Sequence, residues 1–556
     1  MLISSKKEDD LNINNLIRNK IFKLFFRKRL FLYTFFIFIF GTILTIPLDY
    51  GRDKSAFMDR TRKVLSISLG AINPKYRMIN DEIYQYGGNL FGISKRFINA
   101  SFNKVDEIKI NLNFKNYQKL KLLRDKAMNE GILIRSKNDE ASGYLTYKGK
   151  NYPIKIRLKG DWTDHLLGDK WSFRVKTKGN HALLGMENFS LQHPRIRKYI
   201  NEFIFHKLLE YEKLPFLRYT FLPLYINDKY LGIYALEEHF GKNLLENSGY
   251  REGPILKFSD KDLRNNFQYI SFNLKDNGLD GTKNFIDSDL NNAEIQTFNM
   301  NKLLKNDSII DQYILARSLL DKFLRKELTA SEVFDLDKTA KFYAISDLLQ
   351  QLPVWYDIRF YYDPLKGRLV PIGYDLGSGI RTSNRKLAID VNTLNIFDDE
   401  EFTKLYISNL EKLISPDYLD KFLISISKET NKELLNINKS YPHVRFLKNE
   451  LKKNKKYIET RLNTKEPIYI SKYSNFNVEK PNLKIFNKTF FPIEIIELSY
   501  KNKTFIPNFE NTLKGRDKFK RVNSNNYKFK NIEVINKEAE KFSENLIISY
   551  RYKGGS

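Results

Sequence analysis

The longest uninterrupted apolar segment of the chain runs from residue 30 to residue 48, with the sequence LFLYTFFIFIFGTILTIPL. It contains no charged side chain, and as a helix rising about 1.5 Å per residue it nearly spans a hydrocarbon core of about 30 Å. It is longer and more aromatic than the core of a signal peptide, and no A-x-A-like cleavage motif follows it. The pattern therefore predicts one transmembrane helix over residues 30–48.

Basic side chains are concentrated on the N-terminal side of this segment, whereas acidic residues dilute the basic ones that follow it. The N-terminal group is Arg18, Lys20, Lys23, Arg27, Lys28 and Arg29. The positive-inside rule then places residues 1–29 in the cytoplasm as a basic tail. We therefore expect a single-pass membrane protein that is extracytoplasmic from about residue 50 onward, with residues 49–104 as a stalk or linker.

Alternating apolar and polar positions dominate residues 105–280, which we expect to form a β-rich N-lobe. Residues 197–214 have apolar side chains at helical spacing and predict one prominent helix in this lobe. Residues 219–240 are typical of a β-hairpin with its turn at Asn227-Asp228.

Residues 281–465 are mostly helical in pattern and carry one hairpin, so we expect a helical C-lobe. The hairpin lies in VWYDIRFYYDPLKGRLVPIGYDLGSG, residues 354–379, where turn-forming residues separate two runs rich in β-branched and aromatic side chains. Asp357 lies nine residues before Lys366, and Asp375 lies nine residues after it. With a turn centred there, the two carboxylates face each other with Cβ atoms roughly 5 Å apart. Two bare carboxylates at that distance repel each other.

Short apolar runs separated by Asn and Gly characterise residues 466–556 and predict a small all-β module. The order along the chain is a tail, a membrane helix, a stalk, a β-rich lobe, a helical lobe with a hairpin, and a β module. The predicted fold class is therefore α+β, with two lobes in its central part.

Charge and composition narrow the classes of partner. The chain of 556 residues has 94 Lys and Arg against 66 Asp and Glu, which gives a formal net charge of +28. This excess attracts polyanions, but the Lys residues are scattered and no Arg-rich arm or zinc-finger spacing indicates nucleic acid. A biased genome that uses Lys as its default surface residue also explains the excess. Cysteine is absent, which excludes disulfides, thiolate metal sites and cysteine nucleophiles.

The order of these elements is typical of protein-kinase-like folds, in which a strand-rich lobe with one inserted helix precedes a helical lobe. The hairpin of the helical lobe carries one metal ligand at its start and, at its end, an Asp followed by an aromatic or aliphatic residue and Gly. Asp375-Leu376-Gly377 has this form. A divalent cation, Mg²⁺ or Mn²⁺, between Asp357 and Asp375 would convert their repulsion into coordination.

Such a site also needs cations for the phosphates of a nucleotide. The candidates, on neighbouring predicted strands, are Arg157, Lys159, Arg174 and Lys176. We expect a carboxylate from the predicted helix to orient one of them, and Glu202 is the candidate. Each feature alone also fits a turn or a solvated face, so the prediction depends on their order along the chain.

Six collinear segments between about residues 150 and 380 resemble the CotH kinase family, a family of atypical protein-kinase-like proteins. They are IRLKGDWTDH, KWSFRVKTKG, MENFSLQHPRIRKYINEF, YINDKYLGIYALEEHF, EGPILKFSD and IRFYYDPLKGRLVPIGYDLGSG. The resemblance implies a divergent two-lobed kinase fold that uses ATP and a divalent metal. It also implies phosphoryl transfer to a surface or secreted protein or polymer, which the sequence does not identify.

The resemblance also implies roles for individual residues. Asp375 corresponds to the metal-binding aspartate, and Asp357 stands where the family commonly has Asn. Glu238 would lie near the linker that borders the nucleotide. The residues that would face the phosphates are Arg174 or Lys176, with help from Lys159.

The chain departs from the kinase pattern at the general base. In ordinary kinases the catalytic aspartate lies five residues before the first metal ligand, and that count gives Leu352 here. The segment QQLPVWYD has no ionisable side chain before Tyr356, and we expect Asp347 on the preceding helix. Phosphoryl transfer depends mainly on positioning and electrostatics, so loss of the base need not abolish it. Three interpretations stay open: an unusual kinase, a nucleotidyl transferase, and a pseudokinase that acts as an envelope or surface assembly scaffold.

Overall fold

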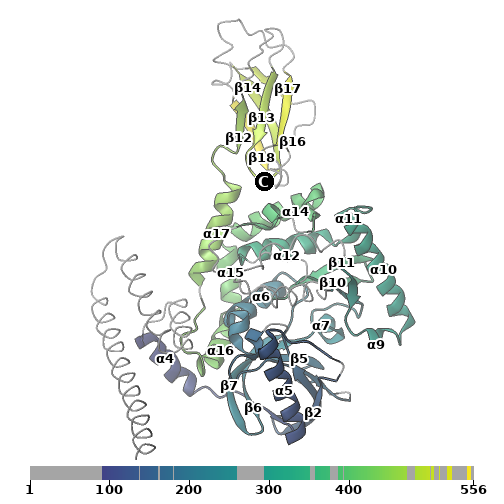
Figure 1. Cartoon of the computed structure of the whole chain (residues 1–556). Helices are drawn as coiled ribbons and strands as arrows, with labels where there is room; N and C mark the ends of the chain where they lie inside the picture. Colours follow the sequence, from purple (N-terminus) through teal and green to yellow (C-terminus); the bar gives the residue numbers. More distant parts are fainter. Residues whose placement is uncertain are drawn as a thin grey trace, which may run out of the picture. The chain divides into compact units, whose positions relative to one another are not determined.

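The computed structural model divides the chain into two compact units, Met1–Lys95 and Arg96–Ser556, and the fold below belongs to the second unit. The residues described are 90–136, 138–160, 163–179, 181–259, 293–350, 353, 357–375, 386–391, 394–446, 448–471, 482–500, 503–505, 512–513, 523–528 and 547–552. Together they form a mixed α+β structure, as predicted (Figure 1).

A closed barrel of seven strands forms the first half of this unit, with the strand order β1-β2-β3-β4-β5-β7-β6. The strands are β1 (Ile108–Asn111), β2 (Ala141–Tyr147), β3 (Lys150–Leu158), β4 (Phe173–Thr177), β5 (Asn188–Gln192), β6 (Tyr219–Ile226) and β7 (Lys229–Glu238). β1 closes the barrel because it pairs antiparallel with β2 and parallel with β6. The β6–β7 turn falls at Asn227-Asp228, both with positive φ, which confirms the predicted hairpin.

Alternation along β3 gives this strand an apolar inner face and a more polar outer face. Ile154, Ile156 and Leu158 are buried in the barrel core. Helix α5 (Phe114–Glu130) packs beside β2 and β3, with its first turn capped by the Asn113 side chain (Figure 1). The intervening positions of β3 face outward, as the sequence pattern predicted.

One row of paired residues crosses the outer face of the barrel. Arg157 on β3 pairs with Arg174 on β4, which pairs with Ser190 on β5. Ser190 pairs with Glu237 on β7, and Glu237 pairs with Tyr219 on β6. Directly paired residues project to the same side of a sheet, so this row brings two arginines and a carboxylate onto one surface.

A second sheet carries the hairpin that the sequence singled out. Its strands are β8 (Ile255–Phe258), β9 (Ile295–Thr297), β10 (Arg359–Asp363) and β11 (Arg368–Ile372), in the order β11-β10-β8-β9. Arg359 pairs with Ile372, so the same register continued outward sets Asp357 opposite Tyr374. The prediction that Asp357 directly faces Asp375 is therefore wrong by one residue.

Helices make up most of the rest of the unit, as the periodicity of residues 283–350 and 400–465 predicted. They are α6 (Ile200–Tyr211), α7 (Lys242–Asn247), α9 (Met300–Leu303), α10 (Asp307–Leu324), α11 (Ala330–Val333), α12 (Leu336–Leu348), α13 (Ala388–Val391), α14 (Glu400–Ile414), α15 (Tyr418–Ser425), α16 (Ser427–Asn438) and α17 (Lys448–Leu462). Helix α6 crosses the hairpin end so closely that a Cβ at Gly373 would lie 2.3 Å from the Phe205 ring. Glycine at this position therefore allows the helix and the hairpin to meet.

Helix α16 fastens the helical part of the chain to the barrel. The buried Glu433 carboxylate accepts hydrogen bonds from the Thr220 hydroxyl and the Phe221 N–H of β6, both at 2.9 Å. Just beyond the helix, the Ser440 hydroxyl accepts a hydrogen bond from the Ile233 N–H of β7 at 3.0 Å. These bonds satisfy backbone donors of two barrel strands that would otherwise be buried without an acceptor.

From Ile468 onward every described element is a strand, in agreement with the all-β pattern of this region. The strands are β12 (Ile468–Ser471), β13 (Asn482–Asn487), β14 (Ile493–Tyr500), β15 (Lys503–Phe505), β16 (Thr512–Leu513), β17 (Asn523–Lys528) and β18 (Ile547–Tyr552). One sheet has the order β12-β13-β17, and in the other β14 pairs with β15, β16 and β18.

The membrane predictions fall on other parts of the chain. Among the described residues, no helix combines the length and the apolar character needed to cross a bilayer. The predicted span 30–48 and the tail 1–29 lie outside the described residues and stay predictions. Of the predicted stalk, the structure describes α4 (Leu90–Ser101) and the residues that lead to β1.

Replacing Glu433 with alanine should lower the free energy of unfolding by about 2–3 kcal/mol, because the buried Phe221 N–H then loses its acceptor. Urea unfolding of the purified chain measures the change. The matched control is Glu429→Ala on the same helix, whose ion pair with Lys207 is exposed and should contribute less than about 1 kcal/mol. Equal losses in the two variants would contradict the fastening role of Glu433.

Candidate functional site

A buried ion pair lies at the centre of the barrel's outer face. Glu237 is fully buried, and its Oε2 lies 2.7 Å from the Nζ of Lys159, the residue that follows β3. Gln192 joins the pair, accepting from Lys159 Nζ at 2.5 Å and donating to Glu237 Oε1 at 2.9 Å. Burial lowers the pKa of Lys159 to about 7; Glu237 opposes this shift, and Arg197 and Arg174 add to it. Near pH 7, Lys159 is therefore present in both its charged and its neutral form.

Asp375 lies just after the end of β11 and has a backbone conformation that residues other than glycine rarely adopt. Its φ is +61°, and its N–H donates to Glu202 Oε1 at 3.0 Å. Its carboxylate forms an ion pair with Arg197 and is 29% exposed. Burial raises the pKa of Asp375 to about 7; Arg197 opposes the shift, while the carboxylates of Asp357, Glu202 and Glu237 add to it. Asp357 and Asp375 thus lie close enough to interact, although they are not directly opposed.

Arg197 connects the two halves of this cluster, and sequence reasoning missed it. It is the last residue of the 3₁₀ turn η2 (Pro194–Arg197), which leads into α6. One guanidinium nitrogen pairs with Asp375, another donates to the Tyr374 hydroxyl at 2.8 Å, and Nε lies 3.6 Å from Glu237 Oε1. The guanidinium also stacks over the Tyr374 ring, 4.9 Å from its centroid. Only 7% of the side chain is exposed, so these protein groups, and not solvent, determine the electrostatic environment of Arg197.

Glu202 does not take the part that the sequence predicted for it. It is fully buried on the first turn of α6, where it accepts the Asp375 N–H and lies 3.4 Å from His206 Nε2. Lys159 takes its carboxylate partner from Glu237 on β7 instead of from the helix. The expected orienting carboxylate therefore exists, but a strand supplies it. Glu202 holds the backbone of Asp375.

The predicted phosphate-facing residues differ in their surroundings. Arg174 lies beside Arg157 in the strand register, and its Nε and Nη1 are buried with no hydrogen-bond partner among the described residues. Burial lowers the pKa of Arg174, although Tyr374 and Glu237 act in the opposite direction. Lys176, two residues along the same strand, is exposed. Arg174 is therefore the residue of this group whose buried donors need an acceptor.

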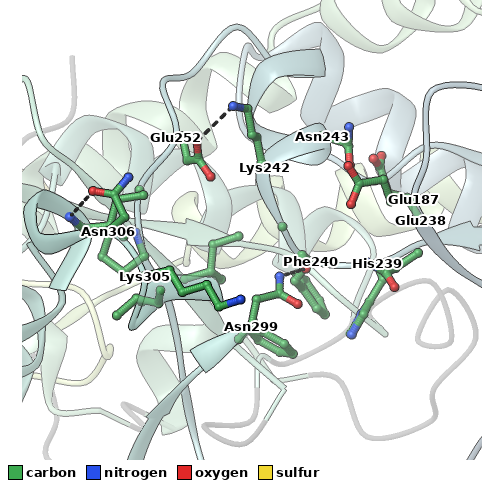
Figure 2. Close-up of a pocket in the computed structure, with 18 residues that line it drawn as sticks. Glu187, Glu238, His239, Phe240, Lys242, Asn243, Glu252, Asn299, Lys305 and Asn306 are labelled. Atoms are coloured by element: carbon green, nitrogen blue, oxygen red, sulfur yellow. Dashed lines mark hydrogen bonds and ion pairs between the residues drawn. The ribbon is translucent and has the colours of Figure 1, made fainter. Parts of the chain in front are cut away.

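Glu238, the other predicted acidic residue, lies in the wall of a pocket and forms a strong ion pair. Its carboxylate contacts Arg218, which donates to it from both Nε, at 2.9 Å, and the backbone N–H, at 3.1 Å. The pocket has a volume of about 320 Å³ and lies where the chain leaves β7 for α7. Figure 2 shows Lys305 extending toward Asn299, with the linker residues His239 and Phe240 on the same side of the pocket.

An aromatic wall joins this pocket to the charge cluster. In the pocket, the ring centroids of Phe240 and Phe298 are 4.7 Å apart. The Phe240 ring also meets the Tyr374 ring edge to face at 5.3 Å. Tyr374 in turn lies under Lys159 and Arg197. One aromatic layer therefore lies between the pocket and the charge cluster.

The position of the general base stays open. Leu352 and most of its neighbours lie outside the described residues. Asp347 is on α12, as predicted, and is fully buried. Its carboxylate accepts hydrogen bonds from the Tyr406 hydroxyl and, at 2.8 Å, from the Ala388 N–H. Burial raises the pKa of Asp347 to about 8, against the effect of these two donors.

At this cluster the structure offers a divalent cation a pair of carboxylates, Asp357 and Asp375. Across the described ranges, three or more His, Asp or Glu side chains are nowhere arranged to hold a metal ion. Asp357 and Asp375 are the pair whose mutual repulsion a cation would relieve. The donor set, two carboxylates with further negative charge behind them, suits a hard divalent cation that completes its shell with other oxygen atoms.

With this geometry in view, comparison with known proteins gives the family. Residues 156–489 match the model of the CotH kinase protein family, and the chain belongs to that family. Membership implies an atypical protein kinase that uses ATP. The match confirms the resemblance and extends beyond its predicted limit, into β13. No curated protein matches the chain.

The structure brings some predicted site residues together and separates others. Those gathered around the cluster are Asp357, Asp375, Lys159, Arg174 and Glu202, with Arg157 beside Arg174 in the row. Two important residues, Glu237 and Arg197, were not predicted. Glu237 precedes Glu238 in ALEEHF, and the alternation of β7 distinguishes the two, because Glu237 shares a face with Ser190. No comparable signal points to Arg197.

The raised pKa of Asp375 predicts a pH-dependent gain in stability for Asp375→Asn. The folded pKa of about 7 exceeds the unfolded value of about 4, so charged Asp375 destabilises the folded state above pH 7. This cost disappears as the pH falls from 7 toward 4. Urea unfolding should show the variant more stable than wild type by about 1–2 kcal/mol at pH 8, with the difference shrinking toward pH 5.

The exposed carboxylate of Asp337 provides the control, because Asp337→Asn should change stability little at either pH. A difference between Asp375→Asn and wild type that is the same at pH 8 and pH 5 would contradict the raised pKa.

Proposed function

We propose that the chain is a membrane-anchored, extracytoplasmic phosphotransferase with a two-lobed protein-kinase-like fold. It uses ATP and Mg²⁺ or Mn²⁺ and modifies a surface or secreted protein or polymer. The observation that carries this proposal is that unsatisfied cationic donors and mutually repelling carboxylates lie at one site. On one side lie the buried donors of Arg174, which have no acceptor among the residues that the structure describes, and on the other lie the repelling carboxylates Asp357 and Asp375. A nucleotide with its divalent cation supplies what each side lacks.

The nucleotide fits the site in two parts. The pocket between β7 and α7, of about 320 Å³, lies within the size range of small-molecule sites and would take the nucleoside. Lys159, Arg157 and Arg174 lie on the neighbouring barrel face and would bind the phosphates. Across the aromatic layer, the phosphates would reach Asp357 and Asp375. Glu238 contributes to the pocket wall, and its pairing with Arg218 fixes the start of the linker.

Asp357 and Asp375 would hold the divalent cation, which supplies charge neutralisation and orientation of the phosphate oxygens when bound. Asp375 must lose its proton to act as a ligand. Its left-handed backbone, held by Glu202, directs its carboxylate toward the cluster, where Arg197 contacts it. Burial lowers the pKa of Lys159 to about 7, and a phosphate beside the ammonium group would favour its charged form.

The membrane part of the proposal is supported by the uncharged segment 30–48 and the basic residues before it. On this proposal the acceptor lies on the same side of the membrane as residues 105–465. The scaffold alternative has one specific observation in its favour, which is Leu352 at the position of the usual catalytic aspartate.

Labelled ATP distinguishes these outcomes. The full chain, purified in detergent, is incubated with Mg²⁺ or Mn²⁺ and either α- or γ-labelled ATP, together with an extract of envelope and secreted material. Transfer of the γ-label alone supports the kinase, and transfer of the α-label indicates nucleotidyl transfer. Binding of ATP without transfer of either label would contradict the phosphotransferase and favour the scaffold.

Arg174→Met should weaken ATP binding about tenfold or more, because it removes charge-assisted hydrogen bonds to the phosphates in a buried site. Titration calorimetry with ATP and Mg²⁺ on the full chain measures the change. Lys176→Met is the matched control, since Lys176 is on the same strand but exposed, and it should change affinity less than about twofold. Similar effects of the two substitutions would contradict a phosphate site at Arg174.

A further inference from the structure

Arg197 is shared unequally between the half-buried carboxylate of Asp375 and the buried carboxylate of Glu237. Its ion pair with Asp375 is close, whereas its Nε stays 3.6 Å from Glu237 Oε1, beyond hydrogen-bond distance. That Nε is buried and has no hydrogen-bond partner among the described residues. A buried donor left unsatisfied is costly, and here a carboxylate oxygen lies within one small movement of it.

Glu237 has room for this donor. Its Oε2 accepts from Lys159 at 2.7 Å and from the Ser190 hydroxyl at 3.3 Å, while its Oε1 accepts from Gln192 at 2.9 Å. A carboxylate has about four acceptor positions, so Oε1 can accept a second hydrogen bond. The Tyr374 hydroxyl, 2.8 Å from another guanidinium nitrogen, anchors Arg197 in the same place. A shift of Nε by roughly 0.5 Å would bring it within hydrogen-bond distance of Glu237 Oε1.

We propose that Arg197 is a positioning residue that exchanges between Asp375 and Glu237. In the protein without a bound cation, Arg197 neutralises Asp375. When Asp375 ligates the divalent cation, Arg197 turns to Glu237, since two cations on one carboxylate repel each other. This inference rests on the proposed function, because it requires a cation at Asp375.

The exchange has a consequence for Lys159. Glu237 is its carboxylate partner, and the pair is fully buried. When Arg197 adds its charge to Glu237, the carboxylate holds Lys159 less strongly, and the ammonium becomes available to a phosphate. Arg197 therefore couples occupation of the cation site to preparation of the phosphate site. The cation and the nucleotide would then bind cooperatively through a side chain that contacts neither the cation nor the phosphates directly.

Direct Mn²⁺ binding without nucleotide tests the exchange. The free Mn²⁺ signal in electron paramagnetic resonance gives the Kd for the full chain in detergent at pH 8, where Asp375 is mostly ionised. The variants are Arg197→Met, which removes the competing charge, and Arg197→Lys, which keeps a charge for Asp375 but lacks the Nε donor that reaches Glu237. Arg461→Met is the matched control, because Arg461 forms a comparable part-buried pair with Asp390, to which no role in the site is assigned. Thermal unfolding confirms that each variant is folded.

The exchange predicts opposite effects of the two Arg197 substitutions. Arg197→Met should bind Mn²⁺ about fivefold more tightly than wild type, and Arg197→Lys about fivefold more weakly, while Arg461→Met should match wild type. If Arg197→Met bound Mn²⁺ more tightly and Arg197→Lys bound it with unchanged affinity, Arg197 would act only by repelling the cation. This result would overturn the exchange. Weaker binding by Arg197→Met would overturn it in favour of a structural role. Absence of Mn²⁺ binding in the wild type would contradict the cation site itself, and with it both proposals.

Discussion

The buried pair of Glu237 and Lys159 is the interaction on which the rest of the site depends. A carboxylate with no exposure to solvent requires a cation and further donors, and it obtains them from β3, β5 and the turn before α6. These elements are fixed relative to one another because the cost of separating buried charges is several kcal/mol. Arg197 extends the same constraint to Asp375, so the barrel face and the hairpin form one electrostatic unit.

Asp375, at the other end of this electrostatic unit, has a strained backbone. Asp375 keeps a positive φ, a conformation that costs about 1–3 kcal/mol for a residue other than glycine and persists only where its surroundings impose it. Here the buried Glu202 holds the N–H and Arg197 holds the carboxylate. Asn and Asp tolerate this conformation better than other residues do. The strain is therefore placed where a fixed direction of the carboxylate matters for ligand binding, in a member of the CotH kinase family.

Strand alternation and helical spacing are local signals, and they predicted the α+β class and the hairpin. The structure places Asp375, Lys159 and Arg174 near one buried charge cluster, while the roles predicted for them and for Asp357 stay predictions. Sequence reasoning missed the hairpin register by one residue, because the β10–β11 loop comprises residues 364–367 and is not centred on Lys366. It missed Arg197 because the chain enters α6 through an irregular turn in which Lys198 and Tyr199 both have positive φ. No periodicity predicts the direction of a side chain in such a turn.

The closed barrel also limits the order in which the chain can fold. The hydrogen bond from Leu112 to Asn227, beside the pairing of β1 with β6, spans 115 residues. At a synthesis rate of roughly 5–20 residues per second, β1 waits on the order of ten seconds before its second partner has been made. During that time one edge of β1 is available to other chains. A chaperone that covers this edge of β1 during synthesis would prevent such pairing.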